Sequence, residues 1–280
     1  MARQRLGQHF LADTGWRKEI AREIRVSPQS ITQPAPGEGK DYCWIEIGAG
    51  HGEMTEHLAS TGAPVHAVEL DPLLAAALKR LAKCCPNLEI LSADILESDI
   101  GKIAGGKRVR VYGNLPYYIT SPILHHLFAS AEIIDEIHIV IQHEVALRLA
   151  AKPGTRDYGY LSVLTQYFSR PELALEIPRN AFRPPPEVNS ALVTLRLPGE
   201  RAKLPQINES AFLEFVKLCF SQKRKTLVNN LKSRVKAELV RESLANLKLR
   251  VDSRAEQLSV INLATLFAQL TFDGTARALA

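Results

Sequence analysis

Between residues 43 and 151 the sequence alternates short apolar segments with longer amphipathic ones. The apolar segments have the length of strands, and they are Cys43–Ile47, Val65–Glu69, Leu88–Leu91, Val109–Tyr112 and Glu136–Ile141. Helical patterns lie between them; one of these has Asp71 as its expected cap and Pro72 as its first residue. Repeated strand–helix–strand units bury both faces of a parallel sheet under helices. We therefore expect an α/β, Rossmann-like domain with a mainly parallel sheet.

The two ends of the chain extend this pattern differently. The N-terminal side offers one helix, Trp16–Ile24, and the segment after residue 151 offers the helix Leu161–Phe168 and two strands, Leu173–Ile177 and Ala191–Leu197. The stretch Asn180–Ser190 is too rich in proline for regular structure. Only helical patterns follow, at Glu209–Phe220, Lys223–Ala237, Val240–Leu247 and Ala255–Leu270. We expect a domain over residues 1–198, with an N-terminal arm over residues 1–25, and a small all-α domain over residues 199–280.

Charge is concentrated in the expected helical domain. Residues 205–280 hold 12 Lys and Arg against 7 Asp and Glu, and this excess equals the net charge of +5 of the whole chain. A basic appendage on a neutral body suggests a polyanionic partner. No apolar run is long enough to cross a membrane, so we expect no membrane partner. The four cysteines (Cys43, Cys84, Cys85 and Cys219) lack metal or redox spacing, so we expect reduced thiols, no metal and a cytoplasmic location.

A glycine-rich turn follows the first strand of the alternating region. It reads Gly48-Ala49-Gly50-His51-Gly52, and the acidic residues Glu69 and Asp94 follow the next two strands. Glycines let a nucleotide-like cofactor approach the backbone, and a carboxylate at the next strand end accepts hydrogen bonds from ribose hydroxyls. The turn lacks the third glycine of the dinucleotide fingerprint, and Asp94 suits an adenine amine, so S-adenosylmethionine is favoured over a nicotinamide dinucleotide. A tight structural turn is the alternative.

A second polar turn, Asn114-Leu115-Pro116-Tyr117, follows the fourth strand. The exocyclic amine of adenine is a poor nucleophile because the ring delocalises its lone pair. Two acceptors that grip its hydrogens, the Asn114 side chain and the Leu115 carbonyl, turn that lone pair out of the ring plane. Pro116 stiffens the turn, Tyr117 offers a ring for stacking, and Phe182 offers a second ring. The alternatives are a buried asparagine at a proline turn and a core phenylalanine.

At this point the chain resembles the KsgA-type small-subunit ribosomal RNA adenine dimethyltransferases, within a superfamily shared with Erm-type enzymes. The matching runs span Gly7 to Leu231, and they include Gly7-Gln8-His9-Phe10-Leu11, IEIGAGHGEMTEHL, VHAVELD, SADIL, GNLPYYITSPIL, YGYLSVLTQYF, FRPPPEVNSALV and FSQKRKTLVNNL. The resemblance implies a class I methyltransferase domain. It also implies dimethylation of two adjacent adenosines in a hairpin loop near the 3′ end of small-subunit rRNA, linked with assembly of the small subunit.

The resemblance also assigns individual residues. Gly48 and Gly50 would hold the methionine end of S-adenosylmethionine, Glu69 its ribose and Asp94 its adenine. The target adenine would lie at Asn114, Leu115, Pro116 and Tyr117, with Phe182 against it, and Asn114 would also contact the cofactor. The N-terminal run, with His9 and Leu11, would close over the cofactor, although His9 stands where the family has asparagine. S-adenosylhomocysteine would be the product, and no metal would take part.

Cations suggest how the RNA is held. Lys223, Arg224 and Lys225 begin a basic stretch in the expected helical domain, and Arg3 and Arg5 form a second group. We expect them to contact phosphates of a small-subunit rRNA or a precursor of the small subunit, with the protein acting as a monomer. A merely solvated helix face is the alternative reading of this stretch.

Three other functions compete with this one. An Erm-type enzyme that methylates large-subunit rRNA shares the fold and both turns, but the long basic C-terminal domain favours the small-subunit enzyme. An assembly factor in which catalysis is secondary is a second alternative, although Glu69, Asp94, Asn114 and Tyr117 are all present. A dinucleotide oxidoreductase is the third, and it gives no reason for the Asn114 turn.

Overall fold

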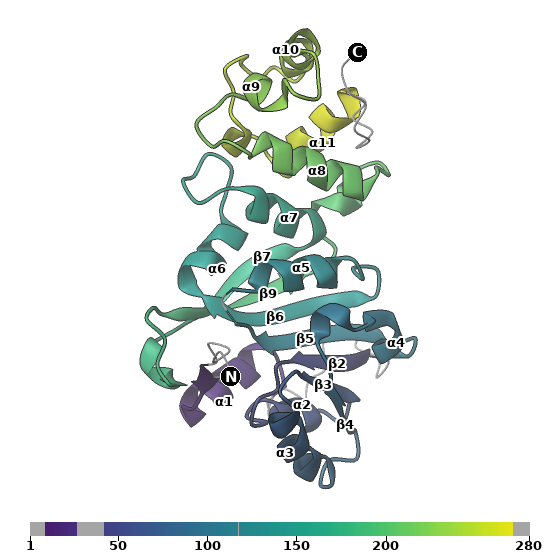
Figure 1. The fold of residues 1–280 in the computed structure, drawn as a ribbon, viewed down its shortest axis with the longest axis vertical. Helices are drawn as coiled ribbons and strands as arrows, with labels where there is room; N and C mark the ends of the chain where they lie inside the picture. The colour runs from purple at the N-terminus through teal and green to yellow at the C-terminus, as the bar shows by residue number, and fades with distance from the viewer. Residues whose placement is uncertain (1–8, 27–41, 117, 271–280) are drawn as a thin grey trace, which may run out of the picture. The chain divides into compact units, whose positions relative to one another are not determined.

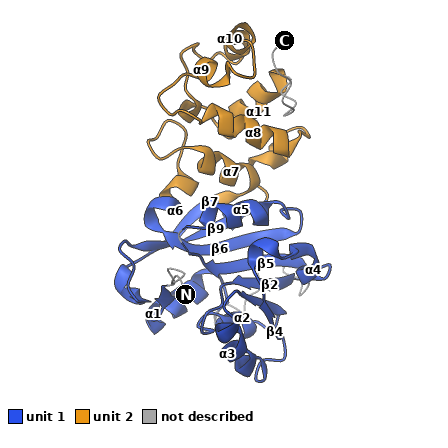
Figure 2. Ribbon diagram, in the orientation of Figure 1, with its two compact units in different colours: residues 1–146, 171–197 blue, residues 147–170, 198–280 orange. Residues whose placement is uncertain are grey.

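The computed structural model describes residues 9–26, 42–116 and 118–270, which form two compact units (Figure 2). Unit 1 comprises Met1–Ala146 and Pro171–Leu197, and unit 2 comprises Leu147–Arg170 and Pro198–Ala280. The chain crosses between the units three times, and the third crossing, between Leu197 and Pro198, lies next to the expected domain boundary at residue 198. The segment 147–170, however, groups with the C-terminal helices, since its helix packs against two of them. The predictions for Arg3, Arg5 and Tyr117 fall outside the described residues.

Unit 1 is built on a seven-stranded sheet, as the alternating pattern predicts (Figure 1). The strand order is β4-β3-β2-β5-β6-β9-β7. Neighbours from β4 through β6 run parallel, and β9 is antiparallel to β6. The bounds are β2 Tyr42–Ile47, β3 Val65–Glu69, β4 Leu88–Ser92, β5 Arg108–Asn114, β6 Ile134–Gln142, β7 Arg170–Ile177 and β9 Ser190–Arg196.

Helices cover this sheet and use the cap residues that the sequence shows. The described helices of this part of the chain are α1 Thr14–Glu23, α2 Thr55–Ala59, α3 Pro72–Ala82, α4 Ile100–Ala104, α5 Thr120–Phe128 and α6 His143–Ala150, the last of which crosses into unit 2. Helix α3 begins as predicted, because the Asp71 carboxylate accepts the N–H of Leu73 and Pro72 needs no partner there. Helices α2 and α3 pack against β3.

The strand order places a ligand edge beside β2. The chain runs outward from β2 to β3 and β4, then returns to the other side of β2 with β5. In open parallel sheets, ligands bind outside the carboxyl ends of the strands at such a reversal. The turns that follow β2, β3, β4 and β5 therefore share one edge of the sheet.

A two-stranded ribbon joins the N-terminal segment to the proline-rich stretch. Strand β1, Phe10–Leu11, pairs antiparallel with β8, Phe182–Arg183. The prediction of no regular structure over Asn180–Ser190 is therefore wrong at its start, where a 3₁₀ turn, Arg179–Ala181, leads into β8. The reason is tertiary, since the backbone partners of Phe182 and Arg183 come from a segment far away in the sequence.

Unit 2 is helical and has an aromatic core. Its helices beyond α6 are α7 Tyr160–Phe168, α8 Glu209–Cys219, α9 Leu227–Leu231, α10 Ala237–Asn246 and α11 Val260–Gln269. The Phe212 ring lies 5.0 Å from Tyr167 and 5.6 Å from Phe267, centroid to centroid. These contacts join α8 to α7 and α11, which is the physical reason that residues 147–170 group with the C-terminal helices.

The expected helix over Lys223–Ala237 is wrong. Lys223, Arg224 and Lys225 lie in a turn, and helix α9 begins only after Thr226, whose hydroxyl accepts the N–H of Asn229. The buried Asn230 explains the interruption, because its Nδ2 donates to the carbonyls of Cys219 and Gln222 at 2.6 and 3.2 Å. A side chain that takes backbone carbonyls in this way replaces helical hydrogen bonds.

The described part of the chain contains neither a membrane-spanning helix nor a cluster of metal-ligating side chains. None of the helices in the described part of the chain is long and apolar enough to cross a membrane. No group of three or more His, Cys, Asp or Glu side chains among residues 9–26, 42–116 and 118–270 is arranged to hold a metal ion.

A carboxyl group is buried in the central strand β2. Glu46 is 2% exposed, and the hydroxyl of Thr55 donates to its Oε2 at 2.6 Å. Burial raises the pKa of Glu46 to about 8, and the charges of Glu53 and Glu69 add to this rise, while the Thr55 hydrogen bond opposes it. The side chain therefore takes its proton in the folded protein at pH values where an unfolded chain has lost it.

Replacing this carboxyl group changes the pH dependence of stability. Because the folded pKa is raised, the contribution of Glu46 is fully present below pH 4.5 and is lost as the pH rises toward 8. The measurement is urea unfolding at pH 4.5, 6 and 8. Between pH 4.5 and pH 8, we expect the free energy of unfolding of the wild type, relative to that of Glu46→Gln, to fall by roughly 2–4 kcal/mol. The exposed Glu56→Gln is the control and should keep the wild-type profile. Parallel profiles for wild type and Glu46→Gln would contradict the assignment.

Candidate active site and basic turn

The glycine turn after β2 lies at the ligand edge of the sheet. Gly48 and Gly50 have φ angles of 69° and 59°, which side chains rarely adopt. A Cβ atom on Gly48 would meet no heavy atom within 4 Å, so the backbone there is open to a ligand. A Cβ atom on Gly50 would lie 3.0 Å from the ring of Phe10, so that face of the turn is already occupied by β1.

Glu69 ties the end of β3 to this turn. The side chain is 2% exposed, and its Oε2 accepts the N–H of Gly50 at 2.9 Å. Its Oε1 accepts the N–H of Asp71, also at 2.9 Å. A carboxylate has about four lone-pair sites, so these two bonds leave acceptor capacity for hydroxyl groups. The structure thus brings Glu69 to the glycine turn, where the sequence predicted it, and also gives it a part in shaping the turn.

Asp94 lies after β4, and, as in Glu69, one part of its carboxylate shapes the backbone while another part stays available to a ligand. Its Oδ1 accepts the N–H of Leu96 at 2.9 Å and so caps the 3₁₀ turn Ile95–Glu97. No described residue donates a hydrogen bond to its Oδ2, which leaves that atom as the acceptor available to an amine.

Two apolar side chains at this edge were missed in the sequence reading. Leu70 and Leu73 are 52% and 68% exposed, and they lie one and four residues after the buried Glu69 in the sequence. Leu70 directly follows Glu69, so it offers an apolar face next to the acceptor of β3. Large apolar residues directly after the acidic residue at a strand end were the signal that could have found them.

The Asn114 turn stands at the end of β5, which neighbours β2 in the sheet. The N–H of Leu115 donates to the carbonyl of Val140 at 3.0 Å, so β6 fixes the turn, and the Leu115 side chain is buried. The carbonyl of Pro116 accepts the N–H of Ile119 at 3.2 Å and leads into α5. The Asn114 Nδ2 donates to the carbonyl of His9 at 2.8 Å, a contact that the sequence did not suggest.

The segment His9–Ala12, which we call the strap, crosses this edge and contacts several parts of the site. The Phe10 ring lies 4.6 Å from the ring of His51 in the glycine turn, centroid to centroid. Leu11 pairs with Phe182, and the His9 Nδ1 lies 2.8 Å from the carbonyl oxygen of Pro184. The structure therefore brings the predicted residues His9 and Leu11 to the site.

Phe182, which the sequence predicts as a ring that lies against the target base, is buried in this structure. Its side chain is 1% exposed and belongs to an apolar cluster with Leu11, Tyr112 and Val140. Its stacking on a base stays a prediction, and the contacts seen here are those of a core residue. Among the described residues, Tyr118, two positions after Pro116, has an aromatic side chain that is 64% exposed.

A second candidate surface lies in unit 2, in the segment Ser221–Thr226, which we call the basic turn. Lys223, Arg224 and Lys225 are exposed there, and no described residue forms an ion pair with them. From Ser221 to Ala237 the sequence has six cations and no acidic residue. The amide of Asn230, 6% exposed, holds this turn through the carbonyls of Cys219 and Gln222.

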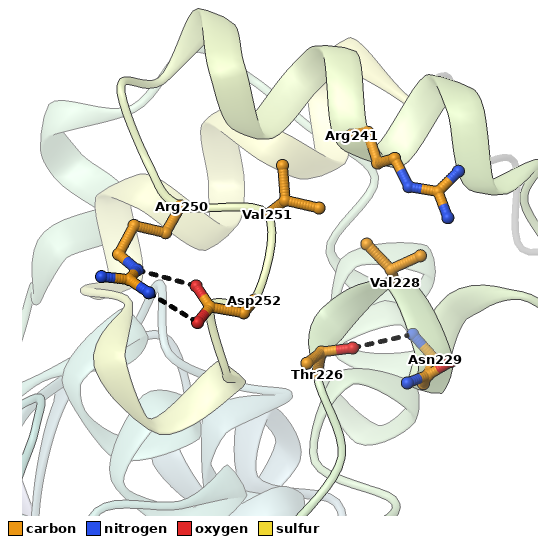
Figure 3. Close-up of a pocket in the computed structure, with 7 residues that line it drawn as sticks. All are labelled: Thr226, Val228, Asn229, Arg241, Arg250, Val251 and Asp252. Atoms are coloured by element: carbon orange, nitrogen blue, oxygen red, sulfur yellow. Dashed lines mark hydrogen bonds and ion pairs between the residues drawn. The ribbon is translucent and has the colours of Figure 1, made fainter.

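Three other arginines of unit 2 each form an ion pair with an acidic residue. Arg241 contacts Glu238 at 3.3 Å, Arg250 contacts Asp252 at 2.8 Å, and Arg254 contacts Glu256 at 3.9 Å. Figure 3 shows Arg241 and Arg250 in the wall of a hollow of about 510 Å³. Its other lining residues are Thr226, Val228, Asn229, Val251 and Asp252. Thr226 joins this hollow to the basic turn, so one surface of unit 2 offers both paired and unpaired cations.

Comparison with known proteins gives one family. The family model for ribosomal RNA adenine dimethylase matches residues 1–271. A Koribacter versatilis protein named ribosomal RNA small subunit methyltransferase A is 37% identical over 95% of this chain and 93% of its own length. A Shewanella frigidimarina protein of the same name is 39% identical over 92% of this chain and 91% of its own length.

Solved structures agree with the fold. A dimethyladenosine transferase from Plasmodium falciparum superposes with a TM-score of 0.77 at 21% identity, covering 94% of this chain and 98% of the other. The 23S rRNA methyltransferase ErmE superposes with a TM-score of 0.68 at 26% identity, covering 94% and 99%. The family match over residues 1–271 and the relatives at 37% and 39% identity show that the chain belongs to the ribosomal RNA adenine dimethylase family.

Proposed function

We propose that this protein transfers methyl groups from S-adenosylmethionine to the exocyclic amines of two adjacent adenosines in a hairpin loop near the 3′ end of small-subunit rRNA. The observation that carries the proposal is the position of the Asn114 turn, at the strand beside the glycine turn and Glu69. The relatives named ribosomal RNA small subunit methyltransferase A support the choice of rRNA. Family membership implies an S-adenosylmethionine-dependent methyltransferase.

The residues at the ligand edge fit S-adenosylmethionine. The open backbone at Gly48, with Gly50 behind it, admits the methionine end, and the remaining lone pairs of Glu69 suit ribose hydroxyls. Asp94 Oδ2 suits the adenine amine, and Leu70 offers an apolar face to the ring. The carboxyl groups near the turn favour a cationic ligand. When bound, the cofactor supplies a methyl group already activated by its positively charged sulfur.

The Asn114 turn prepares the amine. The side-chain Oδ1 of Asn114 and the carbonyl of Leu115 are acceptors, and an exocyclic amine has two hydrogens to give them. Held in this way, the nitrogen lone pair turns out of the ring plane and toward the methyl group. No strong general base is required, because placement supplies most of the rate. Pro116 keeps the turn stiff, and Tyr117 is proposed to stack on the adenine.

Three further assignments complete the proposal. His9 and Leu11, in the strap, close over the cofactor, and Leu11 is held by its strand pairing with Phe182. Lys223, Arg224 and Lys225, in the basic turn, contact rRNA phosphates, and Arg3 and Arg5 add a second contact. We propose a cytoplasmic monomer that acts on a precursor of the small ribosomal subunit and uses no metal.

Transfer of labelled methyl groups tests the function directly. Undermethylated small subunits and, in parallel, large subunits are incubated with the protein and labelled S-adenosylmethionine, and the nucleosides are separated. We expect dimethyladenosine in the small subunit alone. Label only in large-subunit RNA would place the protein with Erm-type enzymes. Bound cofactor with no label in either subunit would favour an assembly factor, and both of these results would overturn the proposal.

Substitutions at the two strand ends should separate cofactor binding from transfer. Asn114→Ala removes the amine acceptor, so kcat should fall by about 10²–10³ while the Kd for S-adenosylmethionine stays near that of the wild type. Glu69→Ala removes charge-assisted hydrogen bonds, so calorimetry should show a Kd raised about 10–100-fold. Each variant is the control for the other. An equal loss of both quantities in Asn114→Ala, or unchanged affinity in Glu69→Ala, would contradict the assigned roles.

The basic turn can be tested by the salt dependence of RNA binding. Replacing Lys223, Arg224 and Lys225 with alanine should reduce the slope of log K against log salt by roughly 2–3. The matched control replaces Arg241, Arg250 and Arg254 with alanine. It removes the same formal charge from the same unit, but each of these arginines already has an acidic partner. Equal changes of slope in the two triple variants would show that net charge, and not the basic turn, governs the affinity.

A further inference from the structure

The hydrogen bond between Asn114 and the strap fixes which end of the Asn114 carboxamide faces the strap. A carboxamide has an acceptor end and a donor end of nearly equal size, so shape alone does not decide which end faces a ligand. In this structure the donor end is used, because Nδ2 donates to the carbonyl of His9 at 2.8 Å. The acceptor Oδ1 therefore points away from the strap.

We propose that the main-chain carbonyl of His9 is a positioning group for methyl transfer: by accepting the Asn114 Nδ2 hydrogen bond, it aims Oδ1 at the target amine. This inference rests on the proposed function, and it adds a role that involves the backbone of residue 9 and not its side chain. A carbonyl oxygen can only accept. The flipped carboxamide would set oxygen against oxygen at His9 and an N–H against the hydrogens of the amine, so both contacts select one orientation.

The position of the His9 carbonyl is fixed by several contacts of the strap. Arg17, from α1, donates from Nε to the carbonyl of Leu11 and from Nη2 to that of Ala12, both at 2.8 Å. The N–H groups of Ala12 and Asp13 donate to the carbonyl of Ala181 at 2.9 and 3.1 Å. These bonds hold the residues that follow His9 in the chain. Phe10 and Leu11 are held in addition by the pairing of β1 with β8.

The same strap also lies against the glycine turn. The Phe10 ring stands where a side chain on Gly50 would be, and it lies 4.6 Å from the His51 ring. Two adjacent residues of the strap therefore contact the two halves of the proposed site. Phe10 contacts the glycine turn, where the cofactor is proposed to bind, and the His9 carbonyl contacts Asn114, where the target amine is proposed to bind. A strap that moves should therefore lower the rate of transfer without changing how the basic turn holds the RNA.

The experiment observes the Asn114 side-chain amide by NMR and compares it with steady-state kinetics. The NH₂ resonances are assigned by their loss in Asn114→Asp. Arg17→Ala loosens the strap by removing two hydrogen bonds, and His9→Gly loosens it by removing the ring that lies against Pro184. Arg22→Ala is the control, because Arg22 lies on the same helix but pairs only with the exposed Glu19.

In the wild type and in Arg22→Ala, we expect the two Asn114 NH₂ protons to be well separated and slow to exchange with water. In Arg17→Ala or His9→Gly they should approach the values of a free carboxamide, and kcat should fall roughly tenfold, as the loss of one oriented hydrogen bond implies. The affinity for RNA should not change. A variant that circular dichroism shows to be unfolded is set aside in favour of the other.

Two results would overturn the inference. One is a wild-type Asn114 amide that already exchanges like a free one. The other is a folded strap variant in which the amide becomes free while kcat keeps its wild-type value. Failure of the proposed function looks different, because the wild type itself would then place no methyl groups on small-subunit adenosines, whatever the state of the Asn114 amide.

Discussion

The hydrogen bond from the Gly50 N–H to the buried Glu69 carboxylate is the contact on which the rest of the site depends. It joins the end of β3 to the turn after β2, in which the backbone of Gly48 is open to a ligand. Phe10 rests on the same turn at Gly50, and the neighbouring His9 carbonyl takes the Asn114 amide. A continuous series of contacts thus links the expected ribose acceptor of the cofactor to the acceptor of the target amine.

The two units divide the work that the proposed reaction requires. Unit 1 holds the strand ends at which we propose that methyl transfer takes place, and the carboxylates near its glycine turn, such as Glu69, suit a cationic cofactor. Unit 2 carries the excess of positive charge and presents it on a turn that a buried asparagine shapes. Because Asn230 fixes the backbone of the basic turn, less conformational freedom remains to be lost in the phosphate contacts that we propose for its cations.

Much of the fold could be predicted because local patterns agree with it. The strands from β2 to β6, the cap at Asp71 and the edge that gathers Gly48, Glu69, Asp94 and Asn114 all follow from periodicity and strand order. The pairing of the strap with strand β8, the contact of the His9 carbonyl with Asn114 and the break before α9 could not be predicted. Each depends on a partner distant in sequence or on one buried side chain, such as Phe182 with Leu11 or Asn230 with Cys219. The burial of the Phe182 side chain could not be predicted either, because it depends on the tertiary packing around the ring.

A crystal structure of the protein with S-adenosylhomocysteine and adenosine bound would show directly whether the two strand ends hold cofactor and target as proposed. We expect ribose hydroxyls of the cofactor product within hydrogen-bonding distance of Glu69. We also expect the adenosine amine between Asn114 Oδ1 and the Leu115 carbonyl, with Asn114 Nδ2 still bonded to the carbonyl of His9. An adenosine amine bound elsewhere, or a cofactor product that leaves Glu69 uncontacted, would contradict the proposal.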